Sequence, residues 1–403
     1  MPIHYLKVSV KIILVTSFLK HMNTVYDVII IGGGIAGASL AYHLVSQGVK
    51  TLLFDRQDQG WATQAGAGIV SPFTASNAIG FGNDSLFHFA VEALEYYPIL
   101  MKQLDKQSDS SIFANNGLMV VAVTEDELEK FEELKSTICQ RFEKRALSTT
   151  KELRFLSNDE AQQMFPPLAE TKGAIYVSRA AQVDGRLIAQ ALYEAAEQHD
   201  LTVKPVGVEQ LIIQNQVVKG VVANGNTFLA QKVAIAGGAW SIEFEKQLGL
   251  KIPIEPLRGQ IIHLNVTNIN TTNKPIISTV SDRYMMSWPD NRLVVGASRE
   301  SVGFDIHTTV TGVHEVLGEA LRVTPGLKDA SLREIRVGLR PIAQDQLPIL
   351  GTAPNIDNLY LATGLGNAGL AAGPYIGKVV AEVILGKNSQ SNIDAFNVQR
   401  FNS

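Results

Sequence analysis

The chain has 403 residues, of which 46% are hydrophobic and 18% are charged; this composition is typical of a folded protein with a large core, and the length suggests two domains. A net charge of −4 without a run of lysine and arginine gives no positive surface for nucleic acid, so we expect no nucleic-acid partner. The single cysteine, Cys139, excludes an intrachain disulfide framework and a cysteine-based metal cluster, and we expect no metal site.

The first 23 residues differ from the rest of the chain. Lys7 and Lys11 precede the uncharged run Ile12–Leu19, which resembles a weak signal-peptide core but is too short to cross a bilayer as a helix. No small-residue cleavage pattern follows it. We therefore expect residues 1–23 to be a disordered or non-native leader, with Met22 as a candidate start and export as the alternative. No integral membrane span is expected.

A glycine-rich turn is predicted to join the first strand to the first helix. Tyr26–Ile31 has strand length and is apolar after Asp27, and GGGIAG follows it with the spacing GxGxxG. Leu40, Leu44 and Val45 then recur at helical spacing. A strand, a tight glycine turn and a helix N-terminus with unpaired N–H groups together form a site for the pyrophosphate of a dinucleotide. The backbone contacts are expected at Gly32, Gly34, Ile35, Ala36 and Gly37.

The second predicted strand ends at an acidic residue. Thr51–Phe54 is apolar, and Asp55 follows it about 20 residues after Gly34. A carboxylate at this distance from the turn accepts hydrogen bonds from the ribose hydroxyls. A GxGxxG pattern alone is often only a glycine-rich turn. With the strand, the helix and the acid in this order, the sequence predicts the ADP half of a bound dinucleotide.

The middle of the chain contains both helical and strand-like segments. Helical periodicity is expected over residues 86–104, 125–145 and 184–199, the last with Asp184 as its N-cap. An apolar run over residues 117–123 predicts a strand, and short strands separated by turn residues follow the third helix.

Features of a nucleotide-binding domain recur at separated positions, which predicts a domain assembled from three segments. The expected fold class is α/β: a Rossmann-type domain with an inserted α+β domain that is built on a mostly antiparallel sheet and binds the substrate. The expected nucleotide-binding segments are 24–80, 160–245 and 331–390. The expected inserted segments are 81–159 and 246–330.

A second glycine turn follows near the end of the chain. The strand-like run Leu359–Thr363 precedes GLGNAG, and a helix follows whose first turn is expected to contain Pro374. A reduced flavin carries negative charge near N1 and C2=O, which a helix N-terminus stabilises. Close packing of helix on strand is the alternative reason for these glycines. Together with the first turn they favour a flavin, with contacts at Gly364, Gly366, Asn367, Ala368 and Gly369.

In their order along the chain, these segments resemble the FAD-dependent amine and amino-acid oxidoreductases of the D-amino-acid oxidase superfamily, and within it glycine oxidase and the D-amino-acid dehydrogenases. The resemblance covers Val25 to about Gly386. It rests on motifs that include VIIIGGGIAGASLAYHL, WATQAGAGIVSP, QVDGRLIAQAL, VGLRPIAQDQLPILG and LYLATGLGNAGL. It implies FAD as the cofactor, with Val206 beside the adenine. Further contacts are implied at Arg56, Thr63, Ala67, Gly68 and Ile69.

The same resemblance assigns the substrate contacts. Arg340, in GLRP, matches the arginine that binds the substrate carboxylate, and Tyr284, in RYMMSW, matches the tyrosine that donates to it. A guanidinium is a planar, bidentate partner for a carboxylate, and a phenol adds a directional donor. An interdomain salt bridge for Arg340 and core packing for Tyr284 are the alternatives.

The chain also departs from the family pattern. Asn367 stands where a related enzyme has a basic residue near the flavin C2=O, which puts the flavin potential and the reactivity with oxygen in question. No cysteine lies near Arg340, and no histidine lies between Trp61 and Ser71, the two regions of covalent flavin attachment in related enzymes. FAD is therefore expected to bind non-covalently.

The implied reaction is the oxidative deamination of a small amino acid of the glycine or D-amino-acid type. Hydride would pass from the α-carbon to flavin N5, and the imino acid would hydrolyse to a keto acid and ammonia. Because the lone pair of a neutral amine promotes hydride transfer, no residue is expected to act as a general acid or base. His263 is then expected as a packed strand residue, and Asp282 as a turn residue.

Several alternatives stay open. Within the flavoenzymes they are a sarcosine-type secondary-amine oxidase, a quinone-linked amino-acid dehydrogenase and, more remotely, a tRNA-modifying flavin oxidoreductase. A pyridine-nucleotide dehydrogenase and a non-catalytic FAD-binding subunit are the others. The expected partners are an amino-acid or amine substrate and oxygen, a quinone or a dye as electron acceptor, with homo-oligomer formation left open. The expected location is the cytoplasm, with peripheral membrane association if a quinone is the acceptor.

Overall fold

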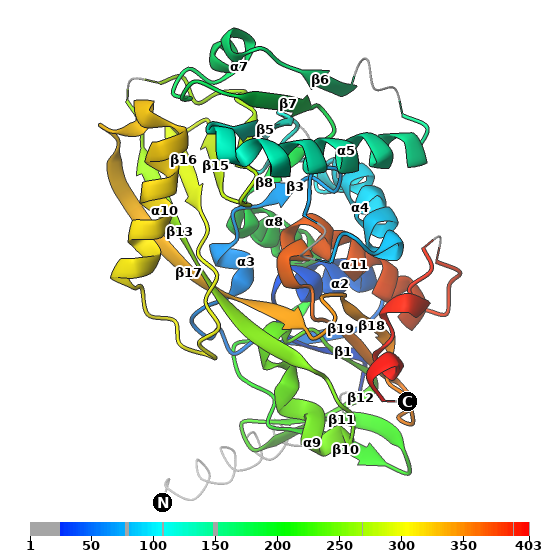
Figure 1. Ribbon diagram of the computed structural model, residues 1–403. Helices are drawn as coiled ribbons and strands as arrows, with labels where there is room; N and C mark the ends of the chain where they lie inside the picture. The colour runs from blue at the N-terminus through cyan, green and yellow to red at the C-terminus, as the bar shows by residue number, and fades with distance from the viewer. Residues whose placement is uncertain are drawn as a thin grey trace, which may run out of the picture.

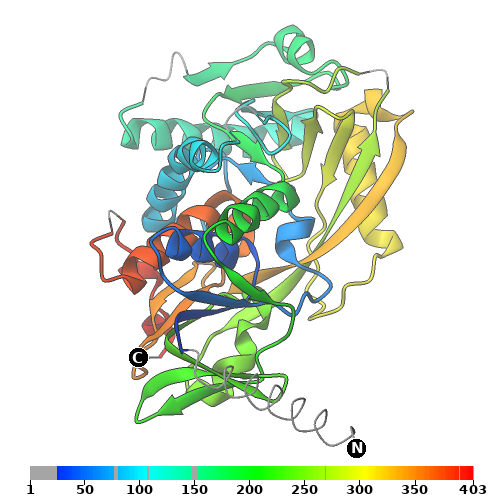
Figure 2. The same ribbon diagram turned by 180° about the vertical axis from the view of Figure 1, so that it is seen from behind.

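The computed structural model describes residues 25–76, 80–106, 109–147, 152–267, 269–389 and 391–402. The expected leader lies outside these residues. Two large sheets form the framework of the molecule, and helices α2, α8 and α11 lie between them (Figures 1 and 2). The chain passes between the two sheets several times, so each is assembled from distant segments of the sequence.

Within the described residues, the first sheet has eight strands and contains the predicted strand–turn–helix start. β1 pairs in parallel with β2 on one side and with β12 on the other, and β2 and β12 continue in parallel to β9 and β19. This parallel core is the expected Rossmann arrangement. The strands are β1 (Val25–Ile31), β2 (Thr51–Phe54), β9 (Thr202–Lys204), β10 (Gln210–Gln214), β11 (Val217–Ala223), β12 (Asn226–Ile235), β18 (Ile349–Thr352) and β19 (Leu359–Thr363).

Helix α2 (Ile35–Val45) packs against both α8 (Gly185–Glu197) and α11 (Gly369–Ile384), and α4 (Asp84–Gln103) packs on α11. Asp184 caps α8 as predicted, because its carboxylate accepts the N–H groups of the first turn at 3.0 and 3.2 Å. The apolar side chains of these helices and of β1 form one buried cluster.

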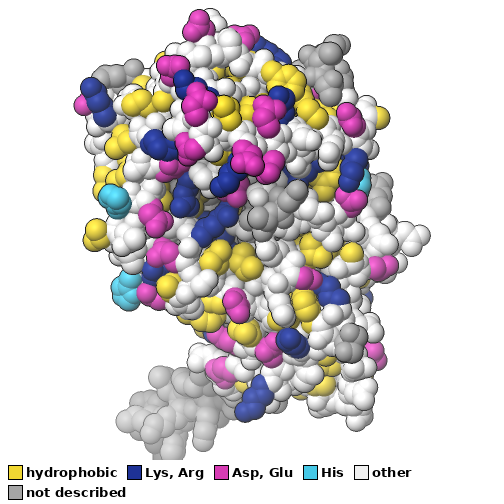
Figure 3. All heavy atoms as spheres, in the orientation of Figure 1, with side chains coloured by type: hydrophobic (Ala, Val, Ile, Leu, Met, Phe, Trp, Pro, Cys, Tyr) yellow, Lys and Arg dark blue, Asp and Glu magenta, His cyan; other side chains and the backbone are white. Residues whose placement is uncertain are grey.

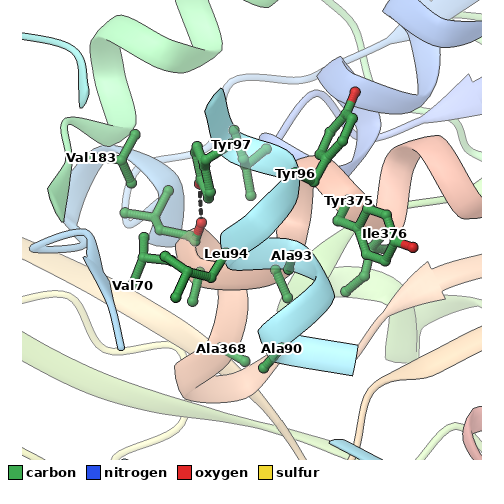
Figure 4. Close-up of a cluster of buried hydrophobic side chains, with 14 of the residues drawn as sticks. Val70, Ala90, Ala93, Leu94, Tyr96, Tyr97, Val183, Ala368, Tyr375 and Ile376 are labelled. Carbon is green, nitrogen blue, oxygen red and sulfur yellow. Dashed lines mark hydrogen bonds between the residues drawn. The ribbon is translucent and has the colours of Figure 1, made fainter. Parts of the chain in front are cut away.

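Pro374 lies in the second turn of α11 and not in the first turn, where it was expected. A proline in this position has no N–H for the carbonyl of Leu370, four residues earlier. The hydroxyl of Tyr97, from α4, donates to that carbonyl instead, as the dashed line in Figure 4 shows. The buried hydroxyl thus compensates for the missing helical hydrogen bond and ties α4 to α11.

The second sheet also has eight strands within the described residues, and its pairs are antiparallel except for β14 with β5. This confirms the prediction of a mostly antiparallel sheet. In spatial order the strands are β17 (Ser331–Ala343), β13 (Ile254–Asn265), β16 (Arg292–Gly296), β15 (Tyr284–Trp288), β14 (Ile276–Thr279), β5 (Leu118–Ala122), β7 (Gly173–Val177) and β6 (Leu153–Phe155).

Two strands of this sheet come from segments that the expected boundaries, at residues 160 and 331, assign to the nucleotide-binding part. β7 pairs with β5, and β17 pairs with β13 along twelve residue pairs. β17 is long because it runs from the second sheet toward the first (Figure 1). It therefore belongs to the second sheet through its pairing, although its end reaches the nucleotide-binding part.

Smaller elements complete the described structure. A three-stranded sheet consists of β3 (Ile69–Val70), β8 (Ala181–Val183) and β4 (Phe113–Ala114). The remaining α-helices are α3 (Ala62–Ala65), α5 (Leu128–Lys144), α7 (Asn158–Met164), α9 (Glu245–Leu248) and α10 (Val310–Val323). On the face drawn in Figure 3, acidic and basic side chains are interspersed, without the extended basic surface that nucleic acid would need.

Candidate cofactor and substrate site

A cavity of about 320 Å³ is lined by residues of both sheets and of the first turns of α2 and α11. Both predicted substrate residues, Arg340 and Tyr284, line it. Three predicted cofactor residues do not: Gly37, Gly364 and Ala368. The predicted cofactor residues that line the cavity are Gly32, Gly34, Ile35, Ala36, Asp55, Arg56, Thr63, Ala67, Gly68, Ile69, Val206, Gly366, Asn367 and Gly369.

The first glycine turn is compact because two of its glycines approach the backbone closely. Gly32 has φ of +105°, and a Cβ there would lie 2.5 Å from the carbonyl oxygen of Ala236. A Cβ at Gly37 would lie 1.9 Å from the carbonyl oxygen of Gly32. Gly37 therefore allows α2 to pack on the turn and does not itself line the cavity. Thr63 accepts the N–H of Ile35 at 2.9 Å, so it caps the first turn of α2.

Asp55 lies at the end of β2, where the sequence predicts an acid for the ribose. Its side chain is 9% exposed and receives the backbone N–H groups of Gly33 and Gln57, while burial raises its pKa to about 6. A Cβ on Gly33 would lie 2.5 Å from the Asp55 carboxylate and 2.0 Å from the hydroxyl of Tyr193. Gly33, the middle residue of the GGG run, was not among the predicted contacts, and it is needed for this arrangement.

Arg56 lines the cavity with acidic partners of its own. Its guanidinium forms a bidentate pair with Glu243, at 2.8 and 2.9 Å, and a further pair with Asp58. The same group lies 5.9 Å from the ring of Trp240. Arg56 therefore holds the segments after β2 and β12 together beside the cavity. Val206, from the segment after β9, lines the same part.

The second glycine turn opens on the cavity at the start of α11. A Cβ at Gly369 would meet no atom within 4 Å, and Gly366 and Asn367 line the cavity beside it. Gly364 has φ of +67° and serves the turn, and Ala368 is 4% exposed and belongs to the core. The two glycine turns thus bound one continuous cavity. This arrangement fits an elongated dinucleotide with its pyrophosphate at α2 and a flavin ring toward α11.

A buried arginine that the sequence analysis did not single out shapes another wall. Arg141, from α5, is 5% exposed and donates to the carbonyl oxygens of Phe73, Ala75 and Phe81 at 3.0, 2.6 and 2.9 Å. Burial lowers the pKa of Arg141 to about 10, so it stays charged at neutral pH. Most residues of the segment Ser71–Ser76, which Arg141 holds in place, line the cavity.

The predicted substrate residues lie on β15 and β17 of the second sheet, with β16 and β13 between them, and each covers a glycine. Tyr284 pairs with Gly296, and a Cβ there would lie 2.5 Å from the Tyr284 hydroxyl. A Cβ on Gly259 would lie 2.3 Å from Nη1 of Arg340. Nη1 of Arg340 also donates to the carbonyl oxygen of Ser298 at 3.3 Å. These two glycines are what leave room for the two functional groups.

The electrostatics of this end suit a carboxylate. Among the described residues, Arg340 has no acidic side chain within 4 Å, so the expected alternative of an interdomain salt bridge finds no partner there. Burial lowers the pKa of Arg340 and raises the pKa of Tyr284. The guanidinium remains a cation and the phenol remains a donor at neutral pH, as recognition of a carboxylate requires.

Two further charged residues line the same end of the cavity. Asp282 lies in the turn between β14 and β15, as expected, with φ of +58°. Its carboxylate lies 3.5 Å from the guanidinium of Arg299. No local motif points to Arg299, because its position depends on how β16 pairs with β13 and β15.

His263 does not line the cavity. It is 1% exposed in β13, as the packed strand residue that was expected. Burial lowers its pKa to about 3. Among the described residues, no cluster of histidine, cysteine and acidic side chains could hold a metal ion. None of the described helices is both long and apolar enough to span a membrane.

Comparison with known proteins gives consistent matches over nearly the whole chain. A family model of FAD-dependent oxidoreductases matches residues 27–383. An uncharacterised oxidoreductase of Bacillus subtilis, YurR, is 36% identical over 373 residues, which cover 91% of this chain and 97% of that protein. The crystal structure of iminodiacetate oxidase from Chelativorans sp. BNC1 is similar with a TM-score of 0.85 and 33% identity, covering 92% of this chain and 98% of the other. Glycine oxidase from Geobacillus kaustophilus has a TM-score of 0.82 at 25% identity, with 93% and 98% covered.

Proposed function

The chain belongs to the family of FAD-dependent oxidoreductases, and from this premise we propose that it oxidises the CH–NH group of a small amino acid, of the glycine or D-amino-acid type. The product is an imino acid, which water hydrolyses to a keto acid and ammonia. One observation carries the proposal: the cavity is lined by a partly buried guanidinium, that of Arg340, which has no acidic partner among the described residues and lies near the phenol of Tyr284.

In this proposal the cofactor is held by the two glycine turns and Asp55, with no covalent attachment. Bound FAD supplies the two-electron acceptor to which the hydride of the substrate α-carbon passes. Asp55 accepts hydrogen bonds from the ribose hydroxyls, and the open start of α11 provides N–H groups and a positive dipole end for the flavin ring.

The protein groups at the other end of the cavity bind and orient the substrate. Arg340 binds the α-carboxylate, and the Tyr284 hydroxyl donates a second hydrogen bond to it, which fixes the α-carbon within the cavity. No histidine is among the described residues that line the cavity. The substrate amine therefore loses its proton to water as it binds, and the binding energy of the carboxylate positions the resulting neutral amine.

A secondary amine is the second candidate substrate. It is favoured by the similarity to iminodiacetate oxidase, whose name specifies an amine with a substituent on nitrogen. Arg340 and Tyr284 would have the same roles, because such a substrate also carries a carboxylate on the α-carbon. Hydrolysis would then release a primary amine in place of ammonia.

A substrate panel tests both candidates. The purified FAD-bound protein is mixed anaerobically with glycine, D-alanine, D-proline, sarcosine, iminodiacetate or an L-amino acid, and bleaching of the flavin absorption is recorded. Bleaching by glycine or a D-amino acid supports the first candidate, and bleaching by sarcosine or iminodiacetate supports the second. No bleaching by any of these, with dithionite still reducing the flavin, would contradict both, and so would bleaching by the L-amino acid alone. Repeating turnover with oxygen and then with a quinone or dye identifies the acceptor, for which Asn367 leaves both classes open.

A further inference from the structure

Arg299 is a second guanidinium at the substrate end of the cavity. It follows β16, and it lines the cavity together with Arg340, Tyr284 and Asp282. Arg340 donates to the carbonyl oxygen of Ser298, the residue directly before Arg299. The two guanidinium groups therefore extend from neighbouring parts of the backbone into the same space. Burial raises the pKa of the Tyr284 hydroxyl, and the charges of both guanidinium groups act against this rise.

The backbone on either side of Arg299 is held in place by a buried network. Glu300 exchanges two backbone hydrogen bonds of 3.0 Å with Arg258. The Arg258 side chain, 3% exposed, forms ion pairs with Glu300 at 2.5 Å and with Asp305 at 2.7 Å. Gln260 donates to Glu300 at 2.7 Å. A loop that is anchored on both sides of one residue gives that residue a fixed direction, as functional groups in binding sites require.

The charges of the neighbouring residues leave Arg299 only partly compensated. Arg283 is engaged elsewhere, because it donates to the carbonyl oxygen of Ala297 and pairs with Glu315 at 3.5 Å. Within the described part of the chain, Arg299 has one ionic partner, Asp282, with 3.5 Å between the closest atoms and both side chains about one-third exposed. The substrate end thus carries two guanidinium groups against one carboxylate, which leaves one net positive charge.

We propose that the natural substrate is an amine with two carboxylates, and that Arg299 binds the second carboxylate while Arg340 binds the first. This inference rests on the proposed function. Such a compound brings one carboxylate for each of the two guanidinium groups. A monocarboxylic amino acid leaves Arg299 without an anion. Asp282 holds Arg299 in position beside the second carboxylate.

Matched pairs of substrates test the proposal with the FAD-bound protein. Sarcosine and iminodiacetate are the first pair, because they differ only by a carboxylate on the nitrogen substituent. D-alanine and D-aspartate are the second pair, in which the extra carboxylate lies on the β-carbon. We expect kcat/KM for one dicarboxylate to exceed that for its partner by at least tenfold, and the pair that shows this locates the second carboxylate.

The variant Arg299→Gln should reduce that preference about 10- to 100-fold, mainly through KM, as the loss of a charge-assisted hydrogen bond predicts. Arg299→Lys keeps the charge and should retain part of the preference. This second variant keeps the proposal testable if Arg299→Gln does not fold. Arg333→Gln is the matched control, because Arg333 is exposed on β17 and pairs with Asp290 away from the cavity. It should leave the preference unchanged.

A binding measurement separates this inference from the proposed function. Diglycolate and methoxyacetate are unreactive analogues that differ only by the second carboxylate, and their dissociation constants follow from the change in flavin absorption on titration. Tighter binding of diglycolate to the wild type, lost in Arg299→Gln, supports the inference whether or not any amine is oxidised. Equal dissociation constants in the wild type would overturn it, and oxidation of monocarboxylic amino acids would then leave the proposed function standing.

Discussion

The guanidinium of Arg340 occupies the space that a side chain on Gly259 would fill, since a Cβ there would lie 2.3 Å from Nη1. Arg340 lies on β17 and Gly259 lies on the neighbouring strand β13. In the pairing of these two strands, Arg340 is opposite Leu257 and Gly338 is opposite Gly259. Gly259→Ala must therefore displace the guanidinium from its position. We expect KM for the amino-acid substrate to rise at least tenfold, measured by steady-state kinetics, while FAD stays bound because the glycine turns are untouched.

Gly318→Ala is the matched control for that substitution. Gly318 lies inside α10, and a Cβ there would meet no atom within 4 Å. Because alanine favours a helix over glycine, this variant should gain up to about 1 kcal/mol in the free energy of unfolding without a change in KM. An unchanged KM in Gly259→Ala as well would show that the position of Arg340 does not matter for substrate binding.

Replacement of Arg340 itself tests its proposed role directly. Arg340→Gln removes the charge but keeps a polar side chain, so kcat/KM for amino-acid substrates should fall by about 10- to 100-fold or more, as expected for a lost charge-assisted pair with a carboxylate. The effect should fall on KM, and it should be much smaller for an amine that lacks a carboxylate. A uniform loss on both kinds of substrate would point to a structural role for Arg340.

The sequence predicts those parts of the site that depend on local chain geometry. A strand, a glycine turn, a helix and an acid follow one another within about 30 residues in a βαβ unit, so the spacing of Gly32, Gly34 and Asp55 already indicates how they lie. The second glycine turn is local in the same way. The side chain of Ala368, a predicted cofactor contact in the same turn, points into the core, because one residue along a turn changes the direction of a side chain.

The parts that were missed depend on pairing between distant segments. Arg299 reaches the cavity only because β16 pairs with β13 and β15, and the room for Arg340 depends on Gly259, about 80 residues earlier in the chain. Arg141 serves the cavity through carbonyl groups that carry no sequence signal. Likewise, only the pairing with β13 shows to which sheet β17 belongs.

Asp55 should lower the stability of the FAD-free protein at neutral pH and should strengthen the binding of FAD. Burial raises its pKa to about 6 from a usual value of 3.8, so between these pH values the folded state holds a proton that the unfolded state has released. The contribution of Asp55 to stability therefore falls as the pH rises from about 4 to about 6, by up to about 3 kcal/mol. Asp55→Asn should remove this loss, so the stability of the variant relative to the wild type should increase between pH 4 and pH 8.

Urea unfolding of the FAD-free proteins at the two pH values measures that difference. The same substitution should weaken FAD binding about 10- to 100-fold, measured by titration, because a charged acceptor for the ribose is lost. Weaker FAD binding without the pH-dependent gain in stability would mean that Asp55 is well solvated in the FAD-free protein, contrary to its burial.

His263 should make the protein sensitive to mild acid without taking part in the reaction. Neither ring nitrogen has a hydrogen-bond partner among the described residues, and burial lowers the pKa to about 3. In the unfolded chain the imidazole of His263 is protonated below about pH 6.5, but in the folded chain it is protonated only below about pH 3. The free energy of unfolding therefore decreases as the pH falls from about 6.5 to about 3. At pH 5 the loss is about 2 kcal/mol relative to pH 8.

The variant His263→Leu tests this expectation, because leucine has a similar volume and cannot titrate. It should unfold at a higher urea concentration than the wild type at pH 5, with a smaller difference at pH 8 and unchanged KM. If the difference between the two proteins were the same at both pH values, His263 would have to be protonated or solvated in the folded state.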